Sequence, residues 1–293
     1  MIEPKKILSF CIPTYNRACY IERCIESIIG YPYNDIEVVV KDNCSTDNTE
    51  EIVKSYSDSR IKFHKNSSNI SMLLNIRTII DFADGKYCFF LTDDDILIPG
   101  AIYIIKDFIF KNNPSVFKSD SIVYLEKSKK SYVYSAIQKT KSNNDLSYKE
   151  RAEIILFSHV LTGLCFKKTE VDFNFYDNNI DLWYPSMLIT GMLSNNMGYL
   201  AKPLTIHTWE NEIFWGVPYK SKEVIDSTTK GILILQSKIE KELFKILLKK
   251  YIISSGLHTS NLFCYFSFYG RIMFIYKIMM KRVKVFFLKI ISY

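Results

Sequence analysis

Paired cysteines are missing from this sequence. Its seven cysteines are scattered, none forms a C-x-x-C motif, and no group of cysteines and histidines has the spacing of a zinc site. This pattern argues against a structural metal centre. Several of the cysteines lie inside apolar runs, where a free thiol behaves as a small buried hydrophobe. Such usage is typical of a reducing compartment, and we predict a cytoplasmic location.

Long apolar runs are also missing. No uninterrupted apolar stretch reaches the ~20 residues that a membrane-spanning helix needs. The apolar segment near the N-terminus stops at Pro13, which is too early for the core of a signal peptide. Internal repeats are not visible either. The sequence therefore predicts neither a spanning helix nor a secretion signal.

Acidic residues are absent after Glu242, although the chain as a whole has a net charge of +7. The basic residues of this last part are Lys245, Lys249, Lys250, Arg271, Lys277, Lys281, Arg282, Lys284 and Lys289. On a helix, the cations between 271 and 289 gather on one side and many apolar residues on the other. This pattern is typical of a helix at an anionic membrane surface. A core-packed helix with a basic solvated face is the alternative.

Strand and helix signals alternate along the first part of the chain. Buried β-branched and aromatic runs predict strands, apolar residues at helical spacing predict helices, and both are separated by turn residues. The predicted strands cover 7–12, 36–40, 61–63 and 87–91, and the predicted helices cover 16–29, 50–56, 70–82 and 101–110. This order predicts an α/β fold with a parallel sheet and right-handed crossovers.

Later segments are less regular. The serine-, lysine- and asparagine-rich segment 127–148 is interpreted as a long loop region. A helix near 152–160, a strand at "GLCFKK" and a helix over about 182–193 follow, then "MGYLAKPLTIHTW" and a helical pattern from Ser221 onward.

Polar clusters follow three of the predicted strands. They are "PTYNR" after the first, "DNCSTD" after the second and "DDD" after the fourth. Ligands bind beyond the carboxyl ends of strands in sheets of this kind, so all three clusters are expected at one edge. Three solvated loops would have to coincide there by chance. The sequence therefore predicts a ligand site at this edge.

The triplet Asp93, Asp94 and Asp95 brings three like charges together at a strand end. A hard divalent cation, Mn²⁺ or Mg²⁺, would make this arrangement tolerable, with substrate phosphates as its other ligands. Alternatively, the triplet is a solvated acidic turn. In the first cluster, Pro13 and Tyr15 could form a platform for a flat base, while Asn16 caps the next helix.

The second cluster places Asp42 at a strand end, where its carboxylate could accept a hydrogen bond from a base N–H. Ser45, Thr46 and Asp47 have the types and spacing of turn and capping residues.

Four stretches together resemble the family 2 glycosyltransferases, which have the GT-A nucleotide-diphosphosugar-binding fold. They are "ILSFCIPTYNRACYIERCIESI", "IEVVVKDNCSTDNTEEIV", "NSSNISMLLNI" and "ADGKYCFFLTDDDILIPGAI", and they cover about the first 110 residues in order. The sequence is most similar to the abequosyltransferase-like subgroup of bacterial surface-polysaccharide enzymes.

The resemblance implies roles for residues at this edge. The residues it places on the nucleotide are Pro13, Thr14, Tyr15, Arg17, Asp42, Asn69, Asn75 and Asp93, with Arg17 near the phosphates and Asp93 toward the ribose. Asp94 is implied as the metal ligand, with Asp95 as a further ligand or support. Thr92 stands where many members carry a first carboxylate, and Ser71 stands where glycine is common.

The catalytic base is harder to place. The family usually carries a carboxylate pair at the start of a helix, and no such pair occurs here. Direct displacement needs a base for the acceptor hydroxyl. We name Asp181, with Asp177 or Glu210 as substitutes, although Asp181 could simply cap the following helix. The acceptor-side candidates are Trp183, His207, Trp209 and Asn211, whose aromatic members either stack on sugar or pack internally.

We therefore predict a GT-A domain over 1–218, with a nucleotide-sugar half at 1–112 and an acceptor half at 113–218. A helical region follows at 219–293, which either associates with the membrane or packs as core. The predicted enzyme is a metal-dependent inverting glycosyltransferase on the inner face of the cytoplasmic membrane. It would transfer sugar from a nucleotide-diphosphosugar to a glycan or polyprenyl-linked glycan in O-antigen, capsule or lipooligosaccharide synthesis, with no nucleic acid partner.

Two alternatives are kept. One is a sugar-nucleotide nucleotidyltransferase, although "PTYNRACY" lacks its glycine-rich basic loop. The other is a non-enzymatic basic protein that binds membrane surfaces or nucleic acid.

Overall fold

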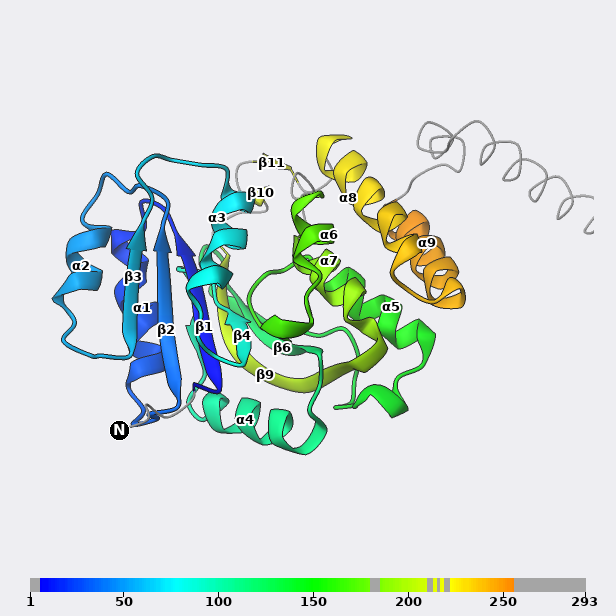
Figure 1. Cartoon of the computed structure of the whole chain (residues 1–293), viewed down its shortest axis with the longest axis horizontal. Coiled ribbons are helices and arrows are strands. Elements are labelled where there is room, and N and C mark those ends of the chain that lie inside the picture. The colour runs from blue at the N-terminus through cyan, green and yellow to red at the C-terminus, as the bar shows by residue number, and fades with distance from the viewer. Residues whose placement is uncertain (1–5, 180–184, 210–212, 215–216, 219–221, 256–293) are drawn as a thin grey trace, which may run out of the picture. The chain divides into compact units, whose positions relative to one another are not determined.

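A computed structural model describes residues 6–179, 185–209, 213–214, 217–218 and 222–255 (Figure 1). Most of the strands belong to one sheet, and the short β10 and β11 form a separate pair. The strands are β1 (Leu8–Thr14), β2 (Ile36–Asp42), β3 (Ile61–Lys65), β4 (Tyr87–Phe90), β5 (Ile96–Leu97), β6 (Val116–Leu125), β7 (Lys130–Tyr134), β8 (Leu164–Lys167), β9 (Met197–Trp209), β10 (Ile213–Phe214) and β11 (Val217–Pro218).

The helices lie between these strands and after them. They are α1 (Ala18–Ile29), α2 (Thr49–Ser55), α3 (Met72–Ile79), α4 (Ala101–Asn112), α5 (Tyr148–Phe157), α6 (Phe173–Asp177), α7 (Pro185–Met192), α8 (Lys222–Ile234) and α9 (Lys241–Ser255). The eight predicted elements of the first part are all present, with ends that differ by a few residues. The predicted helix over about 182–193 corresponds to α7 in its described part.

The large sheet has the strand order β3-β2-β1-β4-β8-β6-β9-β5. The pairs β3–β2, β2–β1 and β1–β4 are parallel, as predicted. The second half is mixed, because β8 runs antiparallel to both β4 and β6, while β6 and β9 are parallel. Because β8 is antiparallel to both of its neighbours, β6 and β9 run in the same direction as β4. The strands β1, β2, β4, β6 and β9 therefore all end at the same edge of the sheet.

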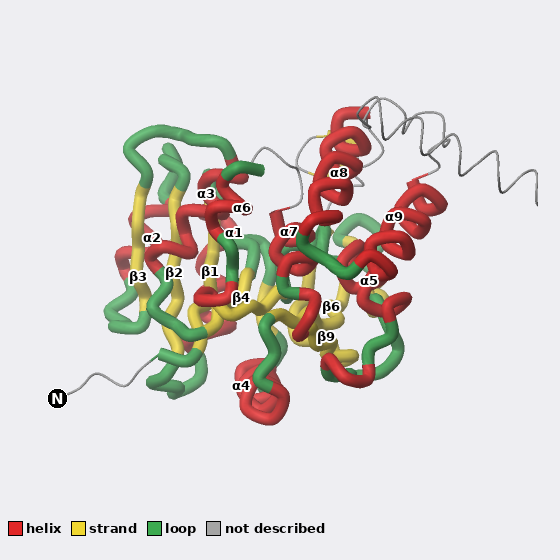
Figure 2. The backbone as a smooth tube through the Cα atoms, turned by 45° about the vertical axis from the view of Figure 1, so that its right-hand side comes forward, coloured by secondary structure: helices red, strands yellow, loops and turns green. Residues whose placement is uncertain are grey.

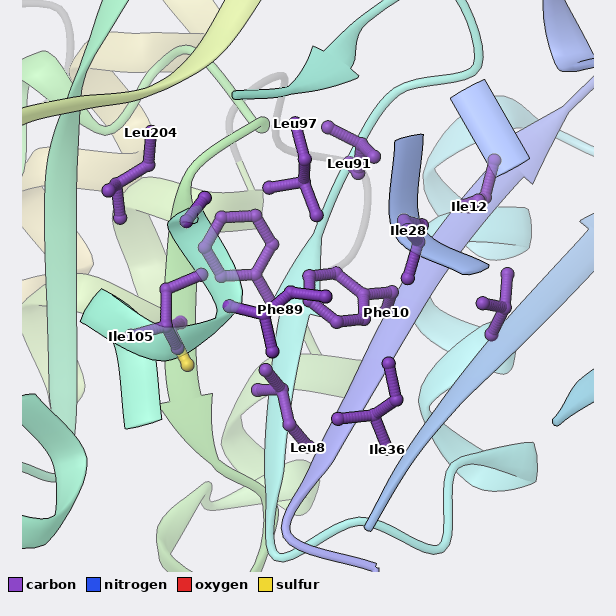
Figure 3. Packing of buried hydrophobic residues seen from close by; sticks show 14 of the residues in the cluster. Leu8, Phe10, Ile12, Ile28, Ile36, Phe89, Leu91, Leu97, Ile105 and Leu204 are labelled. Atoms are coloured by element: carbon purple, nitrogen blue, oxygen red, sulfur yellow. The ribbon is translucent and has the colours of Figure 1, made fainter. Parts of the chain in front are cut away.

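The core of the first half lies between the sheet and helices α1, α2 and α4 (Figures 1 and 3). Alternate residues of β1, Leu8, Phe10 and Ile12, point to this face because side chains of a strand alternate between faces. The ring of Phe10 packs on that of Phe89 from β4, with centroids 5.4 Å apart. Helix α3 contacts β1 and β2 and lies on the opposite side of the sheet from α1 (Figures 1 and 2).

The interpretation of 127–148 as one long loop is wrong. Strand β7 lies within this segment and pairs with β6 as an antiparallel hairpin, Ser121 opposite Tyr134 and Leu125 opposite Lys130. The exposed residues of β7 are mostly polar or aromatic, which hid the strand signal. At the end of the segment, Ser147 and Glu150 form a capping box that begins α5.

Residues up to Leu248 form one compact unit, in which α8 contacts α7. Residues from Lys249 onward belong to a second unit, and their described part continues α9 to Ser255. None of the helices in the described part of the chain is long and apolar enough to cross a membrane. The basic helix predicted between Arg271 and Lys289 lies outside the described residues.

Candidate active site

The polar loops after β1 and β2 are joined by hydrogen bonds at the predicted edge. The Asn16 amide oxygen accepts from the Thr46 N–H at 2.8 Å, and the Asn16 N–H donates to the Ser45 hydroxyl at 2.8 Å. Asn16 itself adopts a left-handed backbone conformation with φ of 52°, which asparagine tolerates better than most residues. These contacts fix the loop that carries Tyr15 and Arg17 against the end of β2.

Asp42 lies at the centre of this joint and is fully buried. Its Oδ1 accepts from the backbone N–H and the hydroxyl of Ser45, at 3.0 and 2.5 Å. Among the residues that the structure describes, its Oδ2 has no hydrogen-bond partner, and the Lys65 Nζ lies 3.8 Å from it. A buried carboxylate oxygen left in this state is costly unless a ligand supplies a donor. Nearby, Pro13 and Thr14 are buried in β1, whereas Tyr15 is 43% exposed.

Four asparagines hold the segment after β3 against Asp42. The Asn43 side chain bonds to Asn69 and to both backbone polar groups of Ile70. Asn66 donates from its side chain to Asn43 at 3.0 Å and to Asn75 at 2.9 Å, and from its backbone to the Asp42 carbonyl at 2.8 Å. Asn75 is buried and donates to the Lys41 carbonyl at 3.1 Å. Asn75, a predicted site residue, is therefore a buried support for the asparagine wall beside Asp42, and its side chain bonds to Asn66 and Lys41.

The three aspartates follow β4 and differ in surroundings. Asp93 is 3% exposed, and its Oδ1 lies 3.6 Å from the Arg17 Nε. Burial raises the pKa of Asp93 to about 7, with a further contribution from the charge of Asp94. Burial, followed by the charge of Asp95, also raises the pKa of Asp94. The structure thus brings Arg17 and Asp93 together at the sheet edge where the sequence predicts the polar clusters.

Asp95 points inward and is already held by protein donors. Its Oδ2 accepts from the hydroxyls of Thr92 and Thr162, each at 2.6 Å. The His207 Nε2 lies 3.8 Å from the same oxygen. Burial raises the pKa of Asp95 to about 6, although the two hydroxyls lower it. With Oδ2 engaged in this way, Asp95 is placed to support the loop, and Asp94 is the more accessible carboxylate.

The backbone of Asp94 is anchored from α1. The Arg23 guanidinium donates to the Asp94 carbonyl at 2.8 Å and to the Thr208 hydroxyl at 3.4 Å. The same guanidinium lies over the Tyr20 ring, 4.9 Å from its centroid. Arg23 thereby connects the aspartate loop with the end of β9. None of these contacts occupies the Asp94 carboxylate.

A divalent cation fits this edge only with help from a substrate. Within the described residues, no group of three or more histidines, cysteines and acids is arranged to hold a metal by itself. The Asp94 carboxylate is a hard oxygen donor beside two buried carboxylates, a set that suits Mg²⁺ or Mn²⁺. Phosphate oxygens of a bound nucleotide would have to complete the coordination, which is usual for Mg²⁺.

The acceptor-side candidates and the proposed bases differ in whether the structure describes them and in where they lie. His207 is 2% exposed under Asp95, and burial followed by the charge of Lys118 lowers its pKa to about 3. The prediction of His207 as a sugar-facing side chain is thus not met by its geometry, because apolar and polar neighbours cover the ring. Trp209 ends β9 at the site edge. Asp181, Trp183, Glu210 and Asn211 lie outside the described residues.

Asp177, the substitute base, is engaged elsewhere. Its carboxylate accepts from the Arg77 guanidinium through both oxygens, at 2.6 and 3.2 Å. Arg77 also lies over the Phe173 ring, 4.3 Å from its centroid, so α3 and α6 are joined through one side chain. Both carboxylate oxygens are engaged by the guanidinium, and Asp177 is better explained as a link between these helices.

Sequence reasoning missed Thr162, Asn43 and Asn66. Thr162 reaches the aspartates from the segment between α5 and β8, and its neighbours "VLTGL" carry no motif. Asn43 directly follows the predicted Asp42, and Asn66 opens "NSSN", so both could have been suspected from position alone.

Comparison with known proteins places this geometry. The model of the family described as "Glycosyl transferase family 2" matches residues 9–168. The chain belongs to this family. The match includes both loops that meet at Asp42 and the aspartate triplet, so the prediction of a glycosyltransferase is confirmed. It also favours an enzyme over the non-enzymatic alternative.

Individual relatives agree with this assignment. Abequosyltransferase RfbV of Salmonella typhimurium is 30% identical over 229 residues, which cover 71% of this chain and 68% of that protein. The Escherichia coli UDP-Glc:alpha-D-GlcNAc-diphosphoundecaprenol beta-1,3-glucosyltransferase WfgD is 33% identical over 109 residues, 37% of this chain and 43% of that protein.

The fold of this glycosyltransferase also resembles solved structures. The S. aureus TarS 1-349 crystal structure superposes with a TM-score of 0.67, covering 88% of this chain and 74% of that one at 18% identity. A second TarS structure, in complex with UDP-GlcNAc, gives a TM-score of 0.65. The predicted GT-A fold is therefore confirmed.

Proposed function

We propose that this glycosyltransferase is metal-dependent and inverting, and that it transfers sugar from a nucleotide-diphosphosugar to a hydroxyl of a lipid-linked glycan in surface-polysaccharide synthesis. The single observation that carries the proposal is the site edge itself. There, Asp42 ends β2 and the accessible Asp94 carboxylate follows β4, the two strands that flank β1, and the Oδ2 of Asp42 has no hydrogen-bond partner among the described residues. Arg17, which follows β1, lies beside Asp93 at the same edge. The name of WfgD, a UDP-Glc:alpha-D-GlcNAc-diphosphoundecaprenol glucosyltransferase, supports both the nucleotide-sugar donor and the lipid-linked acceptor. The TarS complex with UDP-GlcNAc supports the donor, and the abequosyltransferase RfbV supports sugar transfer.

Each residue of the site has its own role in this proposal. Asp42 accepts a hydrogen bond from the nucleobase, and Tyr15 covers the base. Asp93 and Arg17 bind the ribose and the phosphates. Asp94 holds Mn²⁺ or Mg²⁺, which when bound stabilises the negative charge of the departing diphosphate. Asp181 is proposed as the base that takes the acceptor hydroxyl proton, and attack on the face opposite the leaving group inverts the anomeric centre.

The same proposal includes the C-terminal region, the extent of the catalytic domain and the place of the acceptor. Residues 219–293 form a helical region whose basic end contacts the anionic inner surface of the cytoplasmic membrane. Residues 1–218 form the catalytic domain, with the acceptor bound near Trp183, Trp209 and Asn211. Cations near the membrane favour an acceptor that is itself anchored there.

A nucleotide screen tests the donor site. Thermal unfolding of the full chain is followed with each nucleoside diphosphate, with Mn²⁺ or with EDTA. We expect one nucleotide to raise the melting temperature only when the metal is present, because binding to the folded state alone stabilises it. Asp42→Ala should remove the shift. A parent protein that responds to no nucleotide would contradict the proposed function.

Metal-dependent donor binding is expected to weaken in acid. The pKa of Asp93 is raised to about 7, so this carboxylate gains a proton as the pH falls through neutrality. The pKa of Asp94 is also raised, so Asp94 gains its proton at a higher pH than an ordinary aspartate. Protonated carboxylates do not bind cations, so the Mn²⁺ affinity at about pH 5.5 should be roughly tenfold lower than at about pH 8.

Calorimetry with a nucleotide-sugar measures this directly, because the diphosphate of such a donor does not titrate in the range. An affinity that stays constant across the range would show that the protonation of Asp93 and Asp94 does not affect cation binding, and would contradict Asp94 as the metal ligand.

A further inference from the structure

Lys118 of β6 is a fully buried cation close to the aspartate site. Its ammonium donates to the carbonyl oxygen of Val160 at 2.7 Å and to that of Thr162. Within the described residues, no carboxylate lies at ion-pair distance from it. Burial lowers the pKa of Lys118 to about 7, which reflects how unfavourable a charged group is in this position. An apolar residue would fill the same space without the free-energy cost of burying a charge. The presence of a lysine here, with hydrogen bonds to two carbonyl oxygens, therefore needs an explanation.

Those bonds shape the segment 160–163. Gly163 has φ of +83°, and a Cβ at this position would lie 3.0 Å from the Ser119 Oγ of the neighbouring strand. The Gly163 N–H donates to the Phe90 carbonyl at 3.0 Å, at the end of β4. Lys118 on one side and β4 on the other therefore fix this turn immediately beside the aspartate loop.

The turn presents one hydroxyl to that loop. The Thr162 Oγ1 accepts from the Thr92 N–H at 2.9 Å and donates to the Asp95 Oδ2 at 2.6 Å. The Thr92 hydroxyl donates to the same oxygen at 2.6 Å. Thr162 thus contacts the loop at both Thr92 and Asp95, the residues that flank Asp93 and Asp94. All of these contacts are buried or half-buried, where a hydrogen bond to a carboxylate is strong.

We propose that Thr162 and Lys118 are positioning residues of the donor site. Lys118 fixes the turn 160–163, and the Thr162 hydroxyl holds Asp95 inward so that the Asp94 carboxylate faces the cation and the diphosphate. This inference rests on the proposed metal-dependent donor binding. It assigns to two residues outside the aspartate motif the task of orienting that motif.

The test compares Thr162→Val, which keeps the shape and removes the hydroxyl, with Thr162→Ser, which keeps the hydroxyl. Thr190→Val is the matched control, because Thr190 is also fully buried and, within the described part of the chain, its hydroxyl donates to the Ser186 carbonyl of its own helix and to no group of the donor site. Calorimetry of the full chain measures the affinity for Mn²⁺ with the nucleoside diphosphate that the parent binds. Melting temperatures and the KM for acceptor are measured alongside.

We expect Thr162→Val to weaken Mn²⁺ binding by about 10–100-fold, as losses behind a metal ligand usually do, with Thr162→Ser within about threefold of the parent. Thr190→Val should leave the metal affinity unchanged even if it lowers the melting temperature. Lys118→Met should weaken the metal affinity in the same direction as Thr162→Val.

Equal metal affinities in Thr162→Val and the parent would overturn the inference and leave the proposed function intact. Equal losses in Thr162→Ser and Thr162→Val would also overturn it, since packing alone would then be responsible. A parent that binds no nucleotide with Mn²⁺ would overturn the proposed function and this inference together.

Discussion

Replacing Asp94 by asparagine is expected to reduce sugar transfer by at least about a thousandfold, because the leaving diphosphate would lose its charge stabilisation. The amide keeps the size of the side chain but binds a divalent cation weakly. The fold should not suffer. Burial and the charge of Asp95 raise the pKa of Asp94, so its ionised form is unfavourable in the metal-free protein. At about pH 8 we expect Asp94→Asn to melt at the same temperature as the parent or slightly higher.

The matched control is Asp107→Asn on α4. Asp107 pairs with Lys111 on the helix surface, outside the aspartate loop, and the change is chemically the same. Transfer rates with and without Mn²⁺, together with thermal unfolding curves, separate the two effects. Full metal-dependent turnover by Asp94→Asn would show that another group binds the cation.

Replacing Gly85 by alanine is expected to destabilise the protein by roughly 2–4 kcal/mol, a large effect for one methyl group. Gly85 lies just before β4, where a Cβ would sit 2.5 Å from the Ser9 Oγ and 2.6 Å from the Ser9 backbone nitrogen. Its N–H donates to the Ser9 hydroxyl at 2.8 Å. The methyl group would push apart the start of the β1–β4 pairing, and β1 is central in the parallel half of the sheet.

Denaturant unfolding measures the change, with Gly30→Ala as the control. Gly30 follows α1 in a right-handed conformation, and a Cβ there would meet only the Glu26 carbonyl, at 3.1 Å. We expect that variant to stay within about 1 kcal/mol of the parent. A Gly85→Ala protein as stable as Gly30→Ala would mean that the strands separate at little cost.

The first part of the fold could be predicted because its signals are local. Apolar periodicity and turn residues mark β1 to β4 and the helices between them within a few residues. Strand β6 carries none of that alternation, since Lys118, Ser119, Asp120 and Ser121 are all buried polar residues. The antiparallel insertion of β8 between β4 and β6 was equally out of reach, because strand order depends on contacts between distant segments.

In the candidate site, too, features that depend on local signals could be predicted, and contacts between distant segments could not. Asp42, Arg17 and Asp93 lie at one edge of the sheet, because Asp42 ends β2, Arg17 follows β1 and Asp93 follows β4, three strands of the same parallel half. Thr162 contacts Asp95 across 67 positions of sequence, and Asp177 meets Arg77 across 100. Pairings of this kind depend on how two halves pack, so the sequence could name Asp177 as a base without revealing the guanidinium that binds it.

The four asparagines around Asp42 bear on whether a loss of activity in acid is reversible. Amide side chains neither gain nor lose protons, so the wall formed by Asn43, Asn66, Asn69 and Asn75 keeps its bonds in acid. The neighbouring aspartates respond to pH, and this wall does not. A brief exposure to mild acid should therefore abolish activity while the asparagine wall beside Asp42 stays assembled, and activity should return at once when the pH is restored.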